Sequence, residues 1–371
     1  MKVYKIAVLP GDGIGTEITN EALKVLKTVE SHLSDVRFEL ESFDAGAERF
    51  LRSGVTMPED TFDHCKDADA ILMGAIGLPE ARHPDGREVN GDVIFRLRFD
   101  LDLFAGVRPV KLYEGVLSPL RDVSQGIDYV IVRENIEGLY ASRTGGCNVR
   151  GEVATDTIIM TKTGIEKISR YAFRLAEKRK GRISDGASMV TCVDKANVLS
   201  SYAYFRKIYD TVGDQFPHIG RDYVYVDAMT LYQVMNPQMF DVVVAENMFA
   251  DIISDLSSAT VGGLGMAPSG DIGDRHALFQ PAHGTAPSIA GKNIANPYAM
   301  ILSLSMMLDW LGDKHADKSL IAAGQGMEQA VKRVLANGGA KTADIGGKNS
   351  TSDVGNAVVD SLIHSVSEWA K

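Results

Sequence analysis

The chain has 371 residues and a mass of 40.2 kDa, enough for one large or two medium domains with a substantial core. Its formal net charge of −10 and pI near 5.3 argue against nucleic acid or an anionic membrane as a partner, since either would need a basic face. Cys65, Cys147 and Cys192 show no metal-binding or redox spacing, which predicts reduced thiols in a cytoplasmic protein.

Strand-like and helix-like segments alternate from the beginning of the chain. The first expected elements are strands at 4–9, 36–41 and 70–73, with a helix at 16–29. Such alternation predicts a mainly parallel sheet with helices on its faces. The first ten residues alternate like a strand, so we expect no secretory signal. The richest apolar stretch, 299–311, is too short to span a membrane and predicts a buried helix.

A glycine-rich turn, Gly11-Asp-Gly-Ile-Gly15, follows the first expected strand and opens the first helix. It is one residue tighter than the G-x-G-x-x-G fingerprint of dinucleotide-binding loops. We therefore expect its glycines to allow a sharp strand-to-helix turn rather than to form a standard Rossmann phosphate loop.

Three arginines stand among apolar neighbours. Arg98 and Arg108 interrupt otherwise apolar segments, and Arg133 directly follows a predicted buried strand at 129–132. A buried guanidinium needs a fixed anionic partner, and its two parallel N–H groups suit a carboxylate. The pattern indicates a small polycarboxylic acid as ligand, and for each arginine alone a structural salt bridge is the alternative.

Two aspartates lie at the start of a helix that follows a buried strand at 242–245. Asp251 and Asp255 are four residues apart, so they share a helix face, where like charges are destabilising unless something neutralises them. Mg²⁺ or Mn²⁺ would do so with carboxylate ligands, whereas simple interaction with the helix dipole is the alternative. Asp227, placed after an alternating apolar run, favours the metal site.

From Arg133 the chain reads Arg-Glu-Asn-Ile-Glu-Gly-Leu-Tyr140, and His283 begins the run His-Gly-Thr-Ala-Pro. Together with the turn at 11–15, the arginines, Asp194-Lys-Ala-Asn-Val198 and the three aspartates, these motifs resemble the β-decarboxylating dehydrogenases. The family includes 3-isopropylmalate, isocitrate, homoisocitrate and tartrate/D-malate dehydrogenases. The resemblance spans nearly the whole chain, in order, and the joint pattern is highly specific.

The resemblance implies oxidation of a 2-hydroxy diacid to a ketone by a nicotinamide cofactor, followed by loss of the β-carboxylate as CO₂. This chemistry needs a base near the hydroxyl, a cation beside the developing oxyanion and an acid that protonates the enolate carbon. By resemblance Lys195 is the base and Tyr140 assists the protonation. Asp227, Asp251 and Asp255 would hold the metal, and Arg98, Arg108 and Arg133 would bind the substrate.

The family architecture implies an α/β fold of two domains of the isocitrate/isopropylmalate dehydrogenase type, with a mainly parallel large-domain sheet and not a standard Rossmann fold. Both chain ends, 1–103 and 261–371, would form the large domain on the cofactor side. The central domain, 104–260, would carry the dimer interface with the metal and catalytic residues. Lys195 and Asp227 would reach the active site from the partner subunit, so a homodimer with shared active sites is expected and a monomer should be inactive.

Residues 283–297 resemble the family's adenosine-binding loop. The cofactor residues implied by the resemblance are Asn197, His283, Gly284, Thr285, Ala286, Ser288, Ile289 and Asn296. Members that use NAD commonly carry Asp at the position of Ser288, and a neutral hydroxyl excludes the 2′-phosphate of NADP less well. The cationic residues that NADP-using members carry do not occur at the matching positions, so NAD is expected and NADP is the alternative.

The substrate prediction rests on Ile94 and Phe95, which stand where isopropylmalate enzymes place leucines. With Val198 they predict an apolar pocket, which cannot satisfy a buried carboxylate and so favours the substituent of 3-isopropylmalate. The motif at 133–138 is closer to the isocitrate, homoisocitrate and tartrate form, and Arg96 lies beside the position where homoisocitrate enzymes carry arginine. Tartrate/D-malate, isocitrate and homoisocitrate are therefore alternative substrates.

A protein of a different class, a non-catalytic regulatory subunit of a hetero-oligomeric dehydrogenase, is a further alternative. Such subunits typically lose catalytic or metal residues. All of the corresponding residues are present in this chain, which favours an enzyme: Tyr140, Lys195, Asp227, Asp251 and Asp255.

Overall fold

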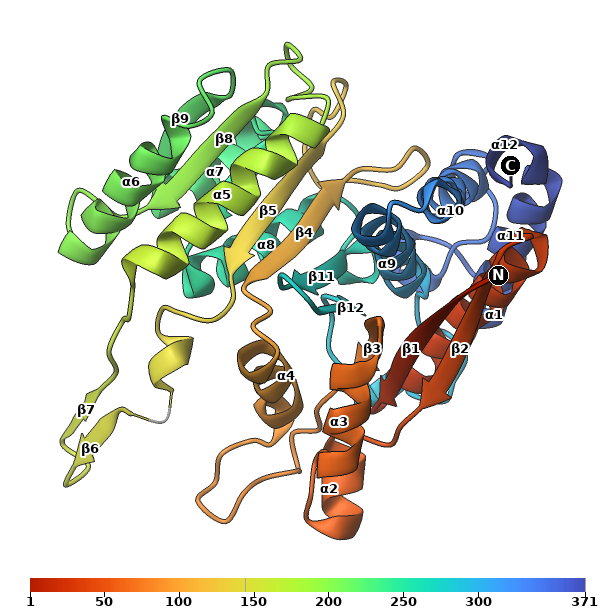
Figure 1. Ribbon diagram of the computed structural model, residues 1–371, viewed down its shortest axis with the longest axis horizontal. Coiled ribbons are helices and arrows are strands. Elements are labelled where there is room, and N and C mark those ends of the chain that lie inside the picture. Colours follow the sequence, from red (N-terminus) through yellow and green to blue (C-terminus); the bar gives the residue numbers. More distant parts are fainter. Residues whose placement is uncertain (144, 371) are drawn as a thin grey trace. The chain divides into compact units, whose positions relative to one another are not determined.

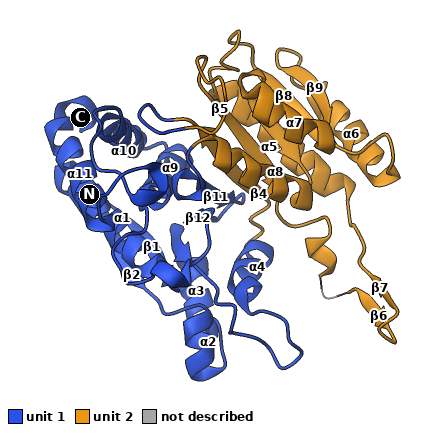
Figure 2. Cartoon of the chain, turned by 180° about the vertical axis from the view of Figure 1, so that it is seen from behind, with its two compact units in different colours: residues 1–101, 113–117, 262–371 blue, residues 102–112, 118–261 orange. Residues whose placement is uncertain are grey.

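The computed structural model describes residues 1–143 and 145–370, and the chain divides into two compact units (Figure 1, Figure 2). Unit 1 comprises residues 1–101, 113–117 and 262–371, and unit 2 comprises residues 102–112 and 118–261. Both ends of the chain thus build unit 1, and the middle builds unit 2. The assignment of cofactor binding to one domain and of dimer contacts to the other stays a prediction.

Unit 1 contains five strands of a mixed sheet in the order β2-β1-β3-β12-β11. Their bounds are β1 Lys2–Gly11, β2 Val36–Ser42, β3 Ala70–Ala75, β11 Pro268–Ile272 and β12 Ala277–Pro281. The helices are α1 Gly15–His32, α2 Ala47–Ser53, α3 Glu59–Asp67, α4 Asn90–Asp100, α9 Tyr298–His315, α10 Lys318–Ala336, α11 Thr351–His364 and α12 Val366–Trp369, with short 3₁₀ turns η3 Leu264–Met266, η4 Pro287–Ile289 and η5 Ala343–Ile345. All neighbours pair in parallel except β11 and β12.

Two long helices cover the strands of unit 1. Helix α1 packs against β1, β2, β3 and α11, and α9 packs against β3, β11, β12 and α10. Helix α9 is buried along most of its length, as the apolar run at 299–311 predicted. In the part of the chain that the structure describes, no helix is long and apolar enough to cross a bilayer.

Unit 2 contains strands in the order β4-β5-β10-β8-β9, and a separate hairpin of β6 and β7. The strand bounds are β4 Ala105–Lys111, β5 Asp128–Glu134, β6 Cys147–Val149, β7 Val153–Thr155, β8 Met189–Asp194, β9 Gly220–Tyr225 and β10 Val242–Ala245. The helices are α5 Lys162–Lys178, α6 Ser200–Gly213, α7 Val226–Met235 and α8 Asn247–Thr260, with 3₁₀ turns η1 Tyr140–Ser142 and η2 Pro237–Met239. All strands of the larger sheet pair in parallel except β4 with β5.

Strand β10 lies at the centre of unit 2 and is fully buried, because α5 packs on one face of the sheet while α7 and α8 cover the other (Figure 1). Val243 and Ala245 belong to a core cluster with Tyr129, Met229 and Ile253. The predicted strand at 242–245 and the helix after it are thus confirmed. This strand-to-helix connection delivers Asp251 and Asp255 to one helix face.

Candidate active site

The two aspartates of α8 lie on a helix whose start is firmly capped. The side chain of Glu246 accepts hydrogen bonds from the backbone N–H groups of Met248 and Phe249. The pKa of Asp255 is raised by partial burial and by the neighbouring charge of Asp251, while Arg108 and Arg133 act in the opposite direction. A pair of carboxylates that repel each other in this way fits a divalent cation.

Three of the predicted site residues, Arg133, Tyr140 and Asp251, come together in unit 2. Arg133 lies at the end of β5, and its Nη1 pairs with Asp251 Oδ1. The Tyr140 hydroxyl donates to Asp251 Oδ2 at 3.1 Å, and the guanidinium carbon of Arg133 lies 5.4 Å from the centre of the Tyr140 ring. Burial and the Asp251 carboxylate raise the pKa of Tyr140, so its hydroxyl keeps its proton at neutral pH.

Arg108, on β4, is the arginine best suited to bind an anionic ligand. Its side chain is buried, with 8% of the residue exposed, and within the described residues its Nε has no hydrogen-bond partner. A buried guanidinium N–H without an acceptor is costly. The site therefore fits a ligand carboxylate.

Lys195 and Asp227 form a pair of their own in unit 2. Lys195 Nζ donates to Asp227 Oδ1 at 2.5 Å, and this hydrogen bond lowers the pKa of Asp227. Asp227 is 67% exposed at the side chain. Across residues 1–143 and 145–370, no three His, Cys, Asp or Glu side chains gather closely enough to hold a metal. Asp227, Asp251 and Asp255 thus do not form one ligand group within a single chain.

Arg98, on α4 of unit 1, has a structural partner. Its Nε donates to Asp271 Oδ2 at 2.9 Å, and both side chains are buried. Arg98 Nε therefore forms a structural salt bridge, which was the alternative to substrate binding that the sequence left open. The remaining N–H groups of the guanidinium are not part of this bond, so a role in substrate binding stays a prediction.

The predicted specificity residues occupy defined faces. Ile94 and Phe95 are partly exposed on α4, at the helical spacing that places them on the face of Arg98. Arg96 points elsewhere, because it pairs with Glu59 at 2.5 Å and lies over the ring of Phe62. Val198, in unit 2, is exposed.

The expected cofactor loop belongs to unit 1 and is rich in backbone contacts. Thr285 Oγ1 donates to the carbonyl oxygen of Gly77 at 2.6 Å, and Ala286 has a left-handed backbone with φ of 39°. Burial lowers the pKa of His283, which keeps its ring neutral, and its buried Nε2 has no partner among the described residues. That nitrogen fits a polar group of a bound cofactor. Gly284 and Ser288 are exposed and Ile289 is partly buried.

Two further predicted cofactor residues differ in how exposed their side chains are. Asn296 is buried, and both ends of its amide are used: Nδ2 donates to Asp344 Oδ2 at 2.9 Å, and Oδ1 accepts from the N–H of Tyr298 at 3.0 Å. Asn197, in unit 2, is exposed. Asn296 therefore fits a direct cofactor contact less well than His283 does.

The glycine-rich turn at 11–15 is a structural element. Asp12 is buried and accepts hydrogen bonds from the backbone N–H groups of Ala47, Glu48 and Gly77, each at 2.8 Å. A Cβ atom at Gly13 would lie 2.3 Å from the Thr285 carbonyl oxygen. The glycine is needed because the turn approaches the cofactor loop closely, as the sharp-turn interpretation expected.

Sequence reasoning missed two residues that contact predicted site residues. Asn247 accepts two hydrogen bonds from Arg133, and Asp344 accepts one from Asn296. In the sequence, Asn247 stood out only as a polar residue two positions after the buried strand. Asp344 was visible in the run Asp-Ile-Gly-Gly, but its partner lies 48 positions away.

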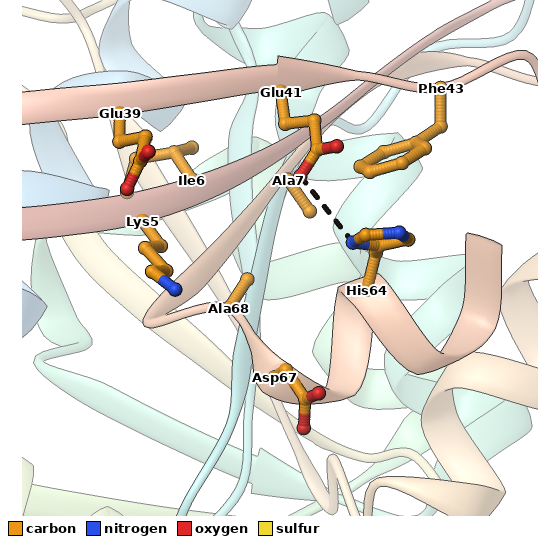
Figure 3. Close-up of a pocket in the computed structure, with 9 residues that line it drawn as sticks. All are labelled: Lys5, Ile6, Ala7, Glu39, Glu41, Phe43, His64, Asp67 and Ala68. Carbon is orange, nitrogen blue, oxygen red and sulfur yellow. Dashed lines mark ion pairs between the residues drawn. The ribbon is translucent and has the colours of Figure 1, made fainter. Parts of the chain in front are cut away.

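Unit 1 also has a hollow of about 270 Å³ beside β1, β2 and α3 (Figure 3). The ring of His64 packs at a tilt against that of Phe43, with ring centres 4.7 Å apart, and its Nδ1 lies 3.4 Å from Glu41 Oε2. The charged side chains around it are exposed, and it contains none of the predicted site residues.

Comparisons with known proteins agree with these motifs. The family model described as isocitrate/isopropylmalate dehydrogenase matches residues 5–358. A 3-isopropylmalate dehydrogenase of Bifidobacterium longum is 44% identical over 87% of this chain and 92% of its own. A 3-isopropylmalate/3-methylmalate dehydrogenase of Methanocaldococcus jannaschii is 43% identical over 96% of this chain and 98% of its own.

A solved structure extends the likeness to the fold. The crystal structure of an isocitrate dehydrogenase from Methylococcus capsulatus superimposes with a TM-score of 0.83 at 34% identity, covering 97% of this chain and 99% of its own. The chain belongs to the isocitrate/isopropylmalate dehydrogenase family.

Proposed function

We propose that the protein is a 3-isopropylmalate dehydrogenase, an enzyme of leucine biosynthesis in the cytoplasm, which uses NAD and Mg²⁺ or Mn²⁺. The contact of Arg133 and Tyr140 with Asp251 is the observation that carries the reaction class. The names of the relatives at 43–44% identity, together with the apolar face of Ile94 and Phe95, support the substrate.

The side chains have distinct tasks in this proposal. Bound NAD would accept the hydride, and the divalent cation would neutralise the developing oxyanion. Arg108 and Arg133 would hold the carboxylates of the acid, with Arg98 as a third candidate. Lys195 would take the proton of the substrate hydroxyl, and Tyr140 would help to protonate the carbon from which CO₂ has left.

A lysine takes up a proton only from its neutral form, and in the structure Lys195 Nζ is paired with Asp227, a predicted metal ligand. Engagement of Asp227 with a cation would weaken this pairing. The same cation would relieve the repulsion between Asp251 and Asp255. Metal binding and activation of Lys195 are therefore linked in the proposal.

A homodimer would complete the metal site. Helix α7 exposes Leu231 and Met235, at 52% and 63%, on the face that carries Asp227, and α8 exposes Ile252, at 56%, one turn before Asp255. Exposed apolar side chains at helical spacing are typical of a protein interface. Asp227 and Lys195 of one subunit would thereby reach the Asp251–Asp255 pair of the other.

Replacing Met235 by Glu should convert the dimer to a monomer that lacks activity, because the charge would lie in the apolar interface. Sedimentation with activity assays on the separated species tests this. Ile363→Glu changes an exposed apolar residue of α11 and should leave the dimer intact. Active monomers would contradict the shared site.

The cofactor preference is proposed to be NAD. Ser288 is neutral, but Asp344, beside Asn296, contributes a negative charge near His283. A carboxylate in this region disfavours the 2′-phosphate of NADP. NADP is the alternative, since Ser288 itself repels no phosphate.

Changing Ser288 to Asp should increase the preference for NAD over NADP by at least about tenfold in kcat/KM, because like-charge repulsion with the 2′-phosphate adds to the discrimination. Ser288→Ala, which adds no charge, is the matched control and should change the ratio little. An unchanged ratio in Ser288→Asp would show that residue 288 does not face the ribose.

Cofactor reduction with a panel of acids tests the proposed function. The acids are 3-isopropylmalate, 3-methylmalate, isocitrate, homoisocitrate, D-malate and tartrate, each with NAD or NADP and with Mg²⁺ or Mn²⁺. We expect the highest kcat/KM for 3-isopropylmalate with NAD. Preference for isocitrate or homoisocitrate would contradict the apolar pocket predicted from Ile94, Phe95 and Val198. No reduction with any acid would support a non-catalytic subunit.

A further inference from the structure

Asn247 links two residues of the candidate site that come from different segments. It is the first residue of α8 and is fully buried. Its Oδ1 accepts hydrogen bonds from Arg133 Nε at 3.1 Å and from Arg133 Nη2 at 2.7 Å. Its Nδ2 donates to the backbone oxygen of Glu137 at 3.2 Å, in the segment that leads to Tyr140. One amide thus contacts both the arginine and the backbone that carries the tyrosine.

The segment between Arg133 and Tyr140 packs tightly on the same amide. Glu134 accepts hydrogen bonds from the N–H groups of Ile136 and Glu137, which folds the chain back towards α8. Gly138 has a φ of 77°, and a Cβ atom there would lie 3.1 Å from the Cβ of Asn247. Little space is left between the segment and the helix, so a change at Asn247 acts directly on the path of the chain to Tyr140.

Only an amide of this size meets both requirements. A carboxylate could accept from Arg133 but could not donate to the Glu137 oxygen, and an apolar side chain could do neither. Loss of the acceptor would remove the oxygen that Arg133 Nε and Nη2 share. The two ends of the amide can therefore be tested separately.

We infer that Asn247 is a positioning residue that fixes Arg133 for substrate binding with its oxygen and the Tyr140 segment for protonation with its nitrogen. The inference rests on the proposed function for the roles of Arg133 and Tyr140. The oxygen end governs the KM for the acid. The nitrogen end governs the share of the enolate, formed after CO₂ has left, that gains a proton at carbon before it is released.

Two substitutions separate these effects. Asn247→Ala removes both the oxygen and the nitrogen of the amide. The KM for 3-isopropylmalate should rise about tenfold, because losing a buried hydrogen bond to a charged group costs about that much in binding. The substitution should also lower the ratio of protonated 2-keto acid to NADH formed during the first turnovers below one, because CO₂ leaves before the protonation that Tyr140 assists. Asn247→Asp keeps the acceptor for Arg133 and should affect the KM less, while the ratio still falls.

A control on the same helix is Ser258→Ala. Ser258 is buried, and its Oγ donates to the Ser254 carbonyl oxygen, so the substitution removes a buried hydrogen bond remote from Arg133. Both the KM and the ratio should stay at the wild-type values. Combining Asn247→Asp with Tyr140→Phe should lower the ratio no further than Tyr140→Phe alone, since both act on one step.

Wild-type KM and a ratio of protonated 2-keto acid to NADH of one in both Asn247 variants would overturn the inference. Crystal structures of the variants provide a second measurement that needs no activity: displacement of the Arg133 guanidinium and the Tyr140 ring is expected, and unmoved side chains would also overturn it. Failure of the wild-type protein to reduce NAD with any acid would instead overturn the proposed function, and these structures would still decide the positioning role.

Discussion

Replacing Lys195 by Met should lower kcat by about 10²–10⁴-fold, the loss expected when a general base is removed. Methionine keeps most of the side-chain volume, and the residue lies in a turn before α6 rather than in the core, so the fold should persist. The expected effect is on kcat more than on KM, because Lys195 would act on the proton of the hydroxyl and not on the carboxylates. Steady-state kinetics with 3-isopropylmalate and NAD measure it.

The matched control is Lys207→Met, which removes an exposed lysine of α6. Its kcat should equal that of the wild type. If the Lys195→Met enzyme had a kcat within a few-fold of the wild type, Lys195 could not be the general base of the reaction.

Replacing Asp251 by Asn should lower kcat/KM by at least about 100-fold, because one negative charge of the proposed metal site is lost. The substitution also weakens the acceptor of the Tyr140 hydroxyl and the partner of the Arg133 guanidinium. Weaker binding of Mn²⁺, measured directly by titration, should accompany the loss. Higher metal concentrations should recover part of the activity.

Asp360→Asn, which changes an exposed carboxylate of α11, is the control for Asp251→Asn and should leave both metal binding and kinetics unchanged. Unaltered Mn²⁺ affinity in Asp251→Asn would contradict its role as a ligand, even if turnover fell. The lost turnover would then be attributed to the contacts with Tyr140 and Arg133.

The parts of the site that sequence periodicity predicted are those encoded locally. Four consecutive apolar residues predicted β10, and the spacing of Asp251 and Asp255 placed both on one face of α8. The motif of eight residues from Arg133 to Tyr140 assigned both residues to one active site through the family resemblance, without predicting a contact between them. Short-range order of this kind depends on hydrogen bonds and side-chain spacing within one or two elements.

The parts that could not be predicted depend on tertiary contacts. Arg98 pairs with Asp271, which lies 173 positions away, and no local pattern marks the two as partners. The role of Asn247 required the simultaneous placement of β5, the Tyr140 segment and α8. The separation of Asp227 from the other two aspartates within one chain was implied only by the family resemblance, because no local pattern in the sequence marks it.

Mixing two inactive variants tests the account most directly. In a dimer of one Lys195→Met chain and one Asp251→Asn chain, shared sites would give one site with both substitutions and one site with neither. Random reassociation should therefore restore about a quarter of the wild-type activity with 3-isopropylmalate, NAD and Mg²⁺, because half of the dimers would be mixed and each would have one intact site. No recovery in dimers shown by mass to be mixed would contradict the shared site, since each site would then draw Lys195 and Asp251 from the same chain.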